Sequence, residues 1–516
     1  MLRYLARLLA ALLVVLPPSP LVTTPPEPFE PPRIQVGGRR VLRPVVVPPI
    51  RVPLTLVPSK STPLLAVRLV VQVGSTQDPP GKEGLAALTG MLLAHGGIRG
   101  ATHEQILERL YPLAASIQVE CGKESTAFLA TMHRDNFDRL IPTLAAILVM
   151  PRLDPEDFKR IRNDVLARLD ALRTENEVDQ LASEILEARI FQGHPYGHSV
   201  LGNRASIEAI TLDDVTRFFR EHYNRDTLRI GMAGGTASFY VDALRSQLGG
   251  IPQATARRSY RIPEVPRREG LEVTIVEAST SHCAITLGFP IEVHRAHADF
   301  SAVRLAVAAL DAQQFGSLSS PAGTRLTSPI SAPAHASMEV AFRSETVDST
   351  LTPEPRSRPH FALSLGGVRP DQAARMLSKT LAELDRFVAE GLSGEQLDAV
   401  QCRLENTTTL GSRRLDKALG LAMARPLLGR ADESDEAGGT QGSASRDEVN
   451  AAIRRHLAPR GIQVVIVSPQ ALASKMATDV EAALRDSSTG ESTAGSPAYR
   501  SGLRVKVLKA GQLATR

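Results

Sequence analysis

The fold is decided by two stretches of sequence, DDVTRFFREHYNRDTLRIGMAG from Asp213 and DEVNAAIRRHLAPRGIQVVIVS from Asp447. Each opens with acidic residues, which stabilise the first turn of a helix because they complement the helix dipole. Each predicted helix ends at a histidine followed by Tyr223 or Leu457, and a turn and an apolar strand come next. The same local pattern occurring twice in one chain predicts an internal duplication.

Three further landmarks recur in the same order and at nearly equal separations along the chain. They are an apolar strand, a β-rich run leading through a turn into a long amphipathic helix, and a second helix. Their paired starting residues are Leu64 and Ser281, Ala127 and Phe361, and Leu153 and Leu392. Strands separated by paired helices predict an α+β protein with two homologous α/β units, each a mostly antiparallel or mixed sheet covered by helices on one face.

Composition and the placement of proline set the expected domain boundaries. At 516 residues, the chain is too long for one ordinary core. We expect the following segments: 1–20 signal-like; 21–58 a Pro-rich arm; 59–248 the first α/β domain; 249–270 a linker; 271–485 the second α/β domain; and 486–516 a polar tail.

The N-terminal segment is typical of an export signal. Arg3 and Arg7 precede the apolar run Leu8–Leu16, which is too short to span a bilayer as a helix. We therefore expect an exported protein of the periplasm or cell envelope, with membrane association only through this segment. Trp is absent and aromatic residues make up 4% of the chain, so stacking platforms for nucleic acid are not expected. The three widely spaced cysteines indicate neither a disulfide framework nor a zinc site.

Two motifs carry a resemblance to a known family. GKEGLAALTGMLLAHGG occupies 81–97, and HPYGHSVLGNRASIEAITLDDVTRFFREHY occupies 194–223. In this order, and over roughly residues 52–469, the chain resembles the pitrilysin/insulinase family of inverzincin peptidases, which includes mitochondrial processing peptidase. The resemblance implies a half-shell built of two α/β units, and paired half-shells that enclose a peptide substrate.

The zinc site of that family is missing from the matching positions. Active members carry H-x-x-E-H on the helix that starts with GLA, where two histidines bind zinc and the glutamate acts as general base. Here the three positions hold Ala87, Gly90 and Met91. The third ligand of the family is a Glu on a later helix, and the matching stretch Val165–Leu169 places Ala167 or a neighbour there. The resemblance therefore implies no metal and no catalytic residue in this chain, with zinc only in a partner subunit.

Other histidines offer weak substitutes. His95 has no histidine or acidic residue one helical turn before it. His194 and His198 have the spacing of a helical zinc pair, but Pro195 and Gly197 between them indicate a structural loop. The HRAH run from His294 to His297 lacks a Glu at helical spacing, so metal binding is not expected there.

The second motif of the family, R-G-L-x-Y, supplies an Arg and a Tyr that hold the substrate carbonyl. The matching segment here, Ser320–Phe342, contains no Tyr, and Arg325 is its one arginine. Arg325 is therefore the only candidate substrate-binding residue.

These observations favour a catalytically inactive subunit that forms a heterodimer with a peptidase-family partner carrying H-x-x-E-H. In this interpretation the pair binds and processes peptides or unfolded protein, and it binds no nucleic acid. Two alternatives remain open: an envelope structural or assembly protein unrelated to proteolysis, and an active zinc metalloendopeptidase with displaced ligands.

Overall fold

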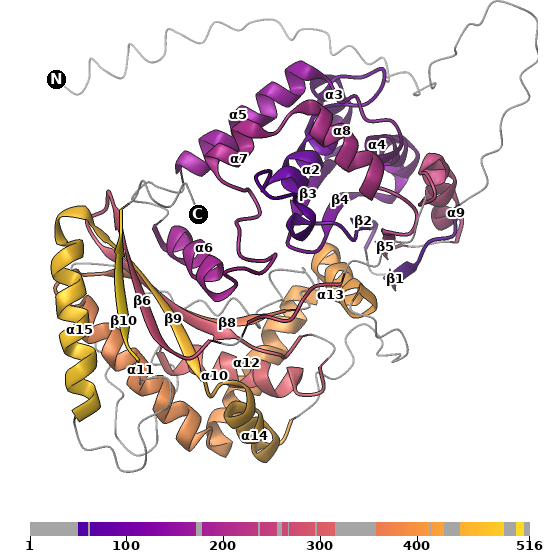
Figure 1. Ribbon diagram of the computed structural model, residues 1–516. Coiled ribbons are helices and arrows are strands. Elements are labelled where there is room, and N and C mark those ends of the chain that lie inside the picture. The colour runs from indigo at the N-terminus through magenta and orange to yellow at the C-terminus, as the bar shows by residue number, and fades with distance from the viewer. Residues whose placement is uncertain are drawn as a thin grey trace, which may run out of the picture. The chain divides into compact units, whose positions relative to one another are not determined.

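A computed structural model describes a large part of the chain. The described residues are 50–59, 62–171, 178–235, 238–254, 261–266, 268–294, 297–314, 358–412, 414–427, 444–489 and 502–509. All of them belong to one compact unit, Pro44–Arg516, which contains two α/β halves (Figure 1).

The first half is built on a five-stranded mixed sheet. Its strands are β1 (Leu54–Pro58), β2 (Leu64–Val71), β3 (Ser116–Cys121), β4 (Thr126–His133) and β5 (Leu228–Gly234). The strand order is β1-β5-β2-β4-β3, with β1 parallel to β5 and the other pairs antiparallel. Seven of the eight residues of β2 are buried, which indicates that both faces of the sheet centre are covered.

Eight helices belong to the described part of the first half. They are α2 (Leu85–His95), α3 (His103–Leu110), α4 (Phe137–Val149), α5 (Pro155–Ala171), α6 (Val178–Ile190), α7 (Arg204–Ala209), α8 (Leu212–His222) and α9 (Ser238–Gln247). Helix α8 starts with a capping box: the Thr211 hydroxyl accepts from Asp214 N–H, and the Asp214 carboxylate accepts from Thr211 N–H.

The second half repeats this plan. Its strands are β6 (Gly270–Ala278), β7 (Cys283–Pro290), β8 (His360–Val368), β9 (Gly461–Pro469) and β10 (Arg504–Leu508). The order is β10-β6-β9-β7-β8, with β10, β6 and β9 mutually parallel and β7 antiparallel to both β8 and β9. The described helices are α10 (Phe300–Gln314), α11 (Ala373–Glu390), α12 (Gly394–Ser412), α13 (Leu415–Leu427), α14 (Arg446–His456) and α15 (Ala473–Thr489).

The predicted duplication and the α+β class are confirmed. Strands β2, β4 and β5 correspond to β7, β8 and β9 in order and direction. The two stretches that opened the sequence analysis form α8 with β5 and α14 with β9.

Each sheet carries a helix from the other half on its second face, which sequence analysis did not predict. Helix α6 of the first half packs on β7, β8 and β9, and α13 of the second half packs on β1, β2 and β5. Leu419 and Met423 of α13 share a buried cluster with Val57, Val70 and other residues of the first sheet. Prediction of helices on one face was therefore incomplete, because the sheets are apolar on both faces and the second face also has to be covered.

Two predicted boundaries are corrected by edge strands. The last residues of the Pro-rich arm, 54–58, form β1, and part of the polar tail, 504–508, forms β10. Both segments contain alternating apolar residues that pair with an existing sheet edge. Helix α15 also continues to Thr489, past the predicted end of the second domain.

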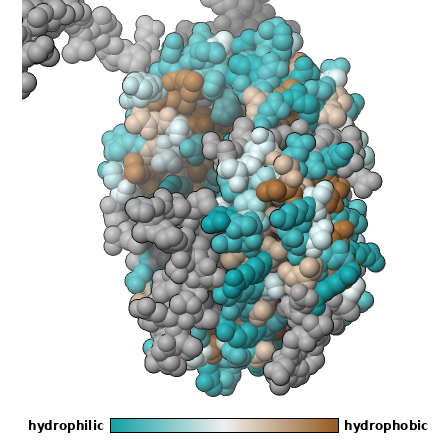
Figure 2. Space-filling view, turned by 90° about the vertical axis from the view of Figure 1, so that its left-hand side faces the viewer, coloured by the Kyte–Doolittle hydropathy of each residue, from teal (hydrophilic) through white to brown (hydrophobic). Residues whose placement is uncertain are grey.

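The surface is typical of a water-exposed protein on the face seen in Figure 2, where hydrophobic side chains form separate groups among hydrophilic ones. Among the described residues, no helix is both long and apolar enough to cross a membrane.

Candidate functional site

Helix α2, which would carry the zinc ligands of an active peptidase, is buried around most of its circumference. Nine of its eleven residues are buried. The hydroxyl of Thr89 donates to the carbonyl of Leu85 at 2.7 Å, so this buried polar group is satisfied within the helix. A helix that is apolar on all sides belongs to a core rather than to the wall of a hydrated site.

The N-terminus of α2 is fixed by a carboxylate that sequence analysis missed. Asp78 accepts the backbone N–H groups of Gly84 and Ala86, each at 2.7 Å. Gly84 has a φ of 96°, and a Cβ there would lie 2.6 Å from the carbonyl oxygen of Leu201, so this position requires glycine. Burial raises the pKa of Asp78 to about 7, although the two N–H bonds lower it. The sequence signal that could have indicated this cap is an acidic residue, Asp78, shortly before Gly84, since glycine can adopt a positive φ.

The two histidine positions and the general-base position on α2 hold no imidazole and no carboxylate. Ala87 is fully buried, and Met91 packs against the hydrophobic core of the first half. At Gly90, the position of the general base, an added Cβ would lie 3.0 Å from Cγ2 of Thr126 and 3.3 Å from Cγ2 of Val119. The helix therefore packs tightly on β3 and β4 where an active enzyme needs a carboxylate and a water molecule.

The third metal position is also without a ligand. Helix α5 packs beside α2, as the resemblance requires, but Ala167 on it is solvent-exposed and apolar. Nearby, Arg160 donates to the backbone carbonyl of His95 at 2.7 Å and to Oδ1 of Asp157 at 3.1 Å. The ring of His95 lies edge-on to His103, with centroids 5.3 Å apart, and burial lowers its pKa. These contacts fix the end of α2 to α5.

The HPYGH motif forms a loop after α6, as predicted. The ring of His194 accepts the N–H of Tyr196 at Nδ1, at 3.1 Å, and its Nε2 lies 3.1 Å from the carbonyl of Pro263. Since Nδ1 is the acceptor, Nε2 carries the proton and donates to that carbonyl. His198 lies with Nδ1 3.0 Å from the carbonyl of Ser199. Both rings bond to backbone groups, in keeping with a structural role.

A buried lysine ties this loop to its surroundings. Lys123, in the β3–β4 hairpin, donates to the carbonyls of Tyr196 at 3.0 Å and His198 at 2.5 Å. Its ammonium also lies 3.6 Å from a carboxylate oxygen of Glu187 on α6. Partners of this kind offset the cost of burying a charge. The β3–β4 hairpin, the HPYGH loop and helix α6, which packs on the second sheet, therefore all contact Lys123.

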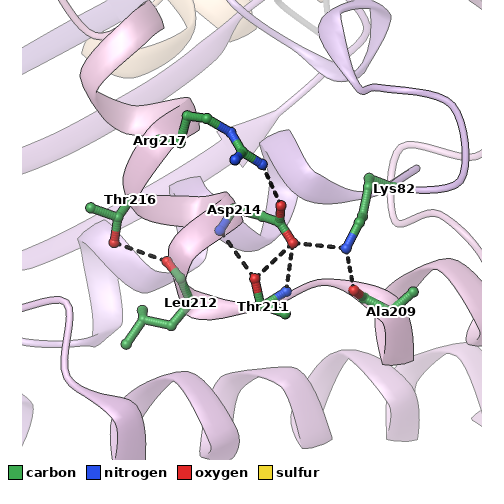
Figure 3. A network of polar contacts seen from close by, with 7 residues as sticks. All are labelled: Lys82, Ala209, Thr211, Leu212, Asp214, Thr216 and Arg217. Atoms are coloured by element: carbon green, nitrogen blue, oxygen red, sulfur yellow. Dashed lines mark hydrogen bonds and ion pairs between the residues drawn. The ribbon is translucent and has the colours of Figure 1, made fainter.

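A second polar network connects the segment before α2 to α8 (Figure 3). The ammonium of Lys82 lies 2.8 Å from Oδ2 of Asp214 and also donates to the carbonyl of Ala209. Burial opposes ionisation of Asp214, but hydrogen bonds from Lys82 and Thr211 outweigh it and lower the pKa of Asp214 to about 2. The family motif begins in the loop that contains Lys82. Through this network, that loop links the end of α7 to the start of α8.

The second half contains one candidate outside the described residues and one inside them. Arg325 and the segment Ser320–Phe342 lie outside, so the substrate-binding prediction remains a prediction. Inside, the turn before α10 brings His297 and Asp299 to His456 at the end of α14. In the described part of the chain, this is the one group of three metal-ligating side chains whose ligand atoms lie close together.

Known proteins agree with this architecture. Residues 54–204 match the insulinase family (Peptidase family M16). The match begins at β1 and ends at the start of α7, so the similarity includes α2 and the HPYGH loop of the first half.

Individual relatives include peptidase subunits and inactive proteins. The chain is 26% identical over 146 residues to a probable mitochondrial-processing peptidase subunit beta from Schizosaccharomyces pombe, covering 28% of this chain and 31% of that protein. It is 22% identical over 246 residues to the non-peptidase homolog YmxG of Helicobacter pylori, covering 47% and 55%. The chain thus spans about a third of the first relative and about half of the second.

The fold of both halves is also known from a solved structure. The peptidase M16 inactive domain from Pseudomonas fluorescens superposes with a TM-score of 0.67 at 22% identity, covering 81% of this chain and 95% of that one. This similarity shows that the shared fold extends beyond residues 54–204 into the second half.

Proposed function

We propose that the chain is a non-catalytic insulinase-family subunit that pairs with a zinc-bearing partner and helps to hold peptides for processing. One observation carries this proposal: the helix that bears the ligands and general base in active enzymes is here a closely packed core helix with Ala87, Gly90 and Met91 at those positions.

Amide hydrolysis by this family's chemistry needs a cation and a base in one place. The cation lowers the pKa of a bound water, and the carboxylate takes its proton. A methyl group, a bare backbone and a thioether provide neither function. Because Gly90 packs against Thr126 and Val119, the base position has also lost the space for a water. The helix therefore lacks both the groups needed for hydrolysis and, at Gly90, the space for the attacking water.

Peptide binding is supported by the position of β3 at the edge of the first sheet, as far as the structure describes that sheet. Strand β3 is the last strand in the described sheet, and its residues alternate between exposed and half-buried. An edge strand presents N–H and C=O groups to which an extended peptide can add as a further strand. Helix α2 packs on β3, so such a peptide would run beside the former metal positions without being cut.

A partner is expected because the fold resembles that of one half-shell, and paired half-shells enclose the substrate in this family. The S. pombe relative is named as a subunit, and the H. pylori relative as a non-peptidase homolog. We place the pair outside the cytoplasm, on the basis of Arg3, Arg7 and the apolar run Leu8–Leu16. The partner would carry H-x-x-E-H and the zinc.

The experiment is purification of the tagged full chain from its native envelope fraction, followed by identification of bound proteins and assay of peptide cleavage. We expect a stoichiometric partner with H-x-x-E-H, cleavage by the pair, and no cleavage by the chain alone. Replacing the motif glutamate of the partner by glutamine is the matched control, and it should abolish cleavage without separating the pair.

Other outcomes favour the alternatives. Cleavage by the isolated chain that is lost on chelation would overturn the proposal in favour of an active peptidase with displaced ligands. Stoichiometric binding to envelope proteins without a peptidase motif would instead favour an assembly role.

A further inference from the structure

The second half contains a cluster of two histidines and a carboxylate that the proposed function does not use. His297 and Asp299 lie in the turn that leads into α10, and His456 is the last residue of α14. One ligand atom from each residue lies within 4.8 Å of those of the other two. Two segments far apart in sequence thus converge on one point.

The chemistry of the cluster suits a cation. Nε2 of His456 lies 2.7 Å from Oδ2 of Asp299, and the His297 and His456 rings lie edge-on with centroids 5.3 Å apart. A carboxylate oxygen beside imidazole nitrogens is the kind of ligand set that divalent metals bind.

The cluster differs from an ordinary surface ion pair. His133 and Asp135 form such a pair, with Nδ1 3.3 Å from Oδ2 and side chains that are 42% and 74% exposed. In the cluster, the side chains of His456 and Asp299 are only 10% and 22% exposed. Burial reduces competition from water, and a second imidazole adds a third potential ligand.

We propose that His297, Asp299 and His456 bind a zinc-type divalent cation that links the turn before α10 to the end of α14. Two imidazole nitrogens and one carboxylate oxygen match the ligand preferences of Zn²⁺, whereas Mg²⁺ and Ca²⁺ prefer oxygen alone. Zinc–nitrogen bonds of about 2.0–2.1 Å require ligand atoms roughly 3.4 Å apart around a tetrahedral ion. Small side-chain rotations would reach this geometry, with Nε2 of His456 and Oδ2 of Asp299 moving apart from their present 2.7 Å. This departs from our expectation, based on sequence, of a chain without its own metal.

Two contacts compete with the cation. Arg455 lies with a guanidinium nitrogen 2.5 Å from Oδ2 of Asp299, and Asp299 N–H donates to Nδ1 of His297 at 3.0 Å. The side chain of Arg455 is 62% exposed, so its guanidinium can turn into solvent. A neutral hydrogen bond contributes little net stability in water, and a metal–imidazole bond readily offsets its loss. Removal of the Arg455 charge should therefore tighten binding.

The test is titration of the chelator-treated full chain with Co²⁺, read by its visible absorption, followed by displacement with Zn²⁺. We expect one Co²⁺ per chain. His297→Ala and His456→Ala should each weaken binding by roughly tenfold or more, because each removes a ligand. His133→Ala is the matched control and should leave binding unchanged.

Arg455→Gln should bind the cation severalfold more tightly than the wild type. This variant keeps all three ligands, so it tests the site even where an alanine variant fails to fold. Absence of stoichiometric binding, equal weakening by His133→Ala, or no tightening by Arg455→Gln would each overturn the three-residue site. The measurement uses the isolated chain and no peptide, so its outcome is separate from that of the proposed function.

Discussion

Replacing Met423 by alanine should destabilise the sheet of the first half, although Met423 lies on a helix of the second half. Met423 lies on α13 in the second half, is 3% exposed, and packs in the cluster that includes Ala66, Val70 and Ala233 of the first sheet. The contact is close: a Cβ added at Gly231 of β5 would lie 2.1 Å from the sulfur of Met423. Large-to-small changes at buried sites cost about 2–5 kcal/mol, and we expect about 3 kcal/mol for Met423→Ala.

The measurement is urea unfolding combined with amide hydrogen exchange. Peptides covering β1, β2 and β5 should lose protection in Met423→Ala, although the substitution lies in the other half of the chain. Met476→Ala is the matched control, because Met476 is equally buried but packs in the core of its own half. If Met423→Ala changed exchange only in peptides of the second half, the reasoning about the exchanged helix would be wrong.

Three further predictions follow from the polar contacts and the former metal site. The pKa of Asp214 is about 2 when folded and 3.8 in the reference state, so the contacts of the ionised carboxylate with Lys82 and Thr211 together contribute about 2 kcal/mol above pH 4, and this is lost as the pH falls through 2. The difference in unfolding free energy between wild type and Asp214→Asn should shrink accordingly, and a difference independent of pH would contradict this. Lys123→Met should cost about 3 kcal/mol in thermal or urea unfolding, because it leaves buried acceptors unpaired, and Lys123→Met combined with Glu187→Gln should recover part of the loss. Ala87→His with Gly90→Glu and Met91→His should not create peptidase activity in a fluorogenic peptide assay, because the stretch Val165–Leu169 of α5 holds no third ligand and because β3 and β4 crowd the base position. Zinc-dependent cleavage by this variant would refute the argument.

Much of the fold could be predicted because it depends on local patterns. The acidic first turns of α8 and α14 and the apolar strands after them are written in consecutive residues. The lack of histidine and glutamate at the family's site positions could likewise be read from Ala87, Gly90 and Met91 in a fixed helical frame, and the structure adds that Ala87 and Gly90 are buried.

Features that depend on long-range packing were missed. Nothing in α6 or α13 taken alone indicates which sheet it covers, since an apolar face fits either one. The cap of α2 by Asp78 depends on a turn that only the folded loop defines. Metal binding at HRAH was not expected because no Glu lies at helical spacing from these histidines, and the sequence gives no sign that folding brings His456 to His297.

The exchange of α6 and α13 also has a consequence for the order of events during synthesis. The first sheet is complete in sequence once β5 has been made, yet one of its faces stays uncovered until α13 emerges from the ribosome nearly two hundred residues later. During that interval the nascent chain would expose an apolar surface that no helix covers, which favours aggregation and binding by holdase chaperones. A chain interrupted between its halves should therefore yield two insoluble fragments rather than two small soluble proteins.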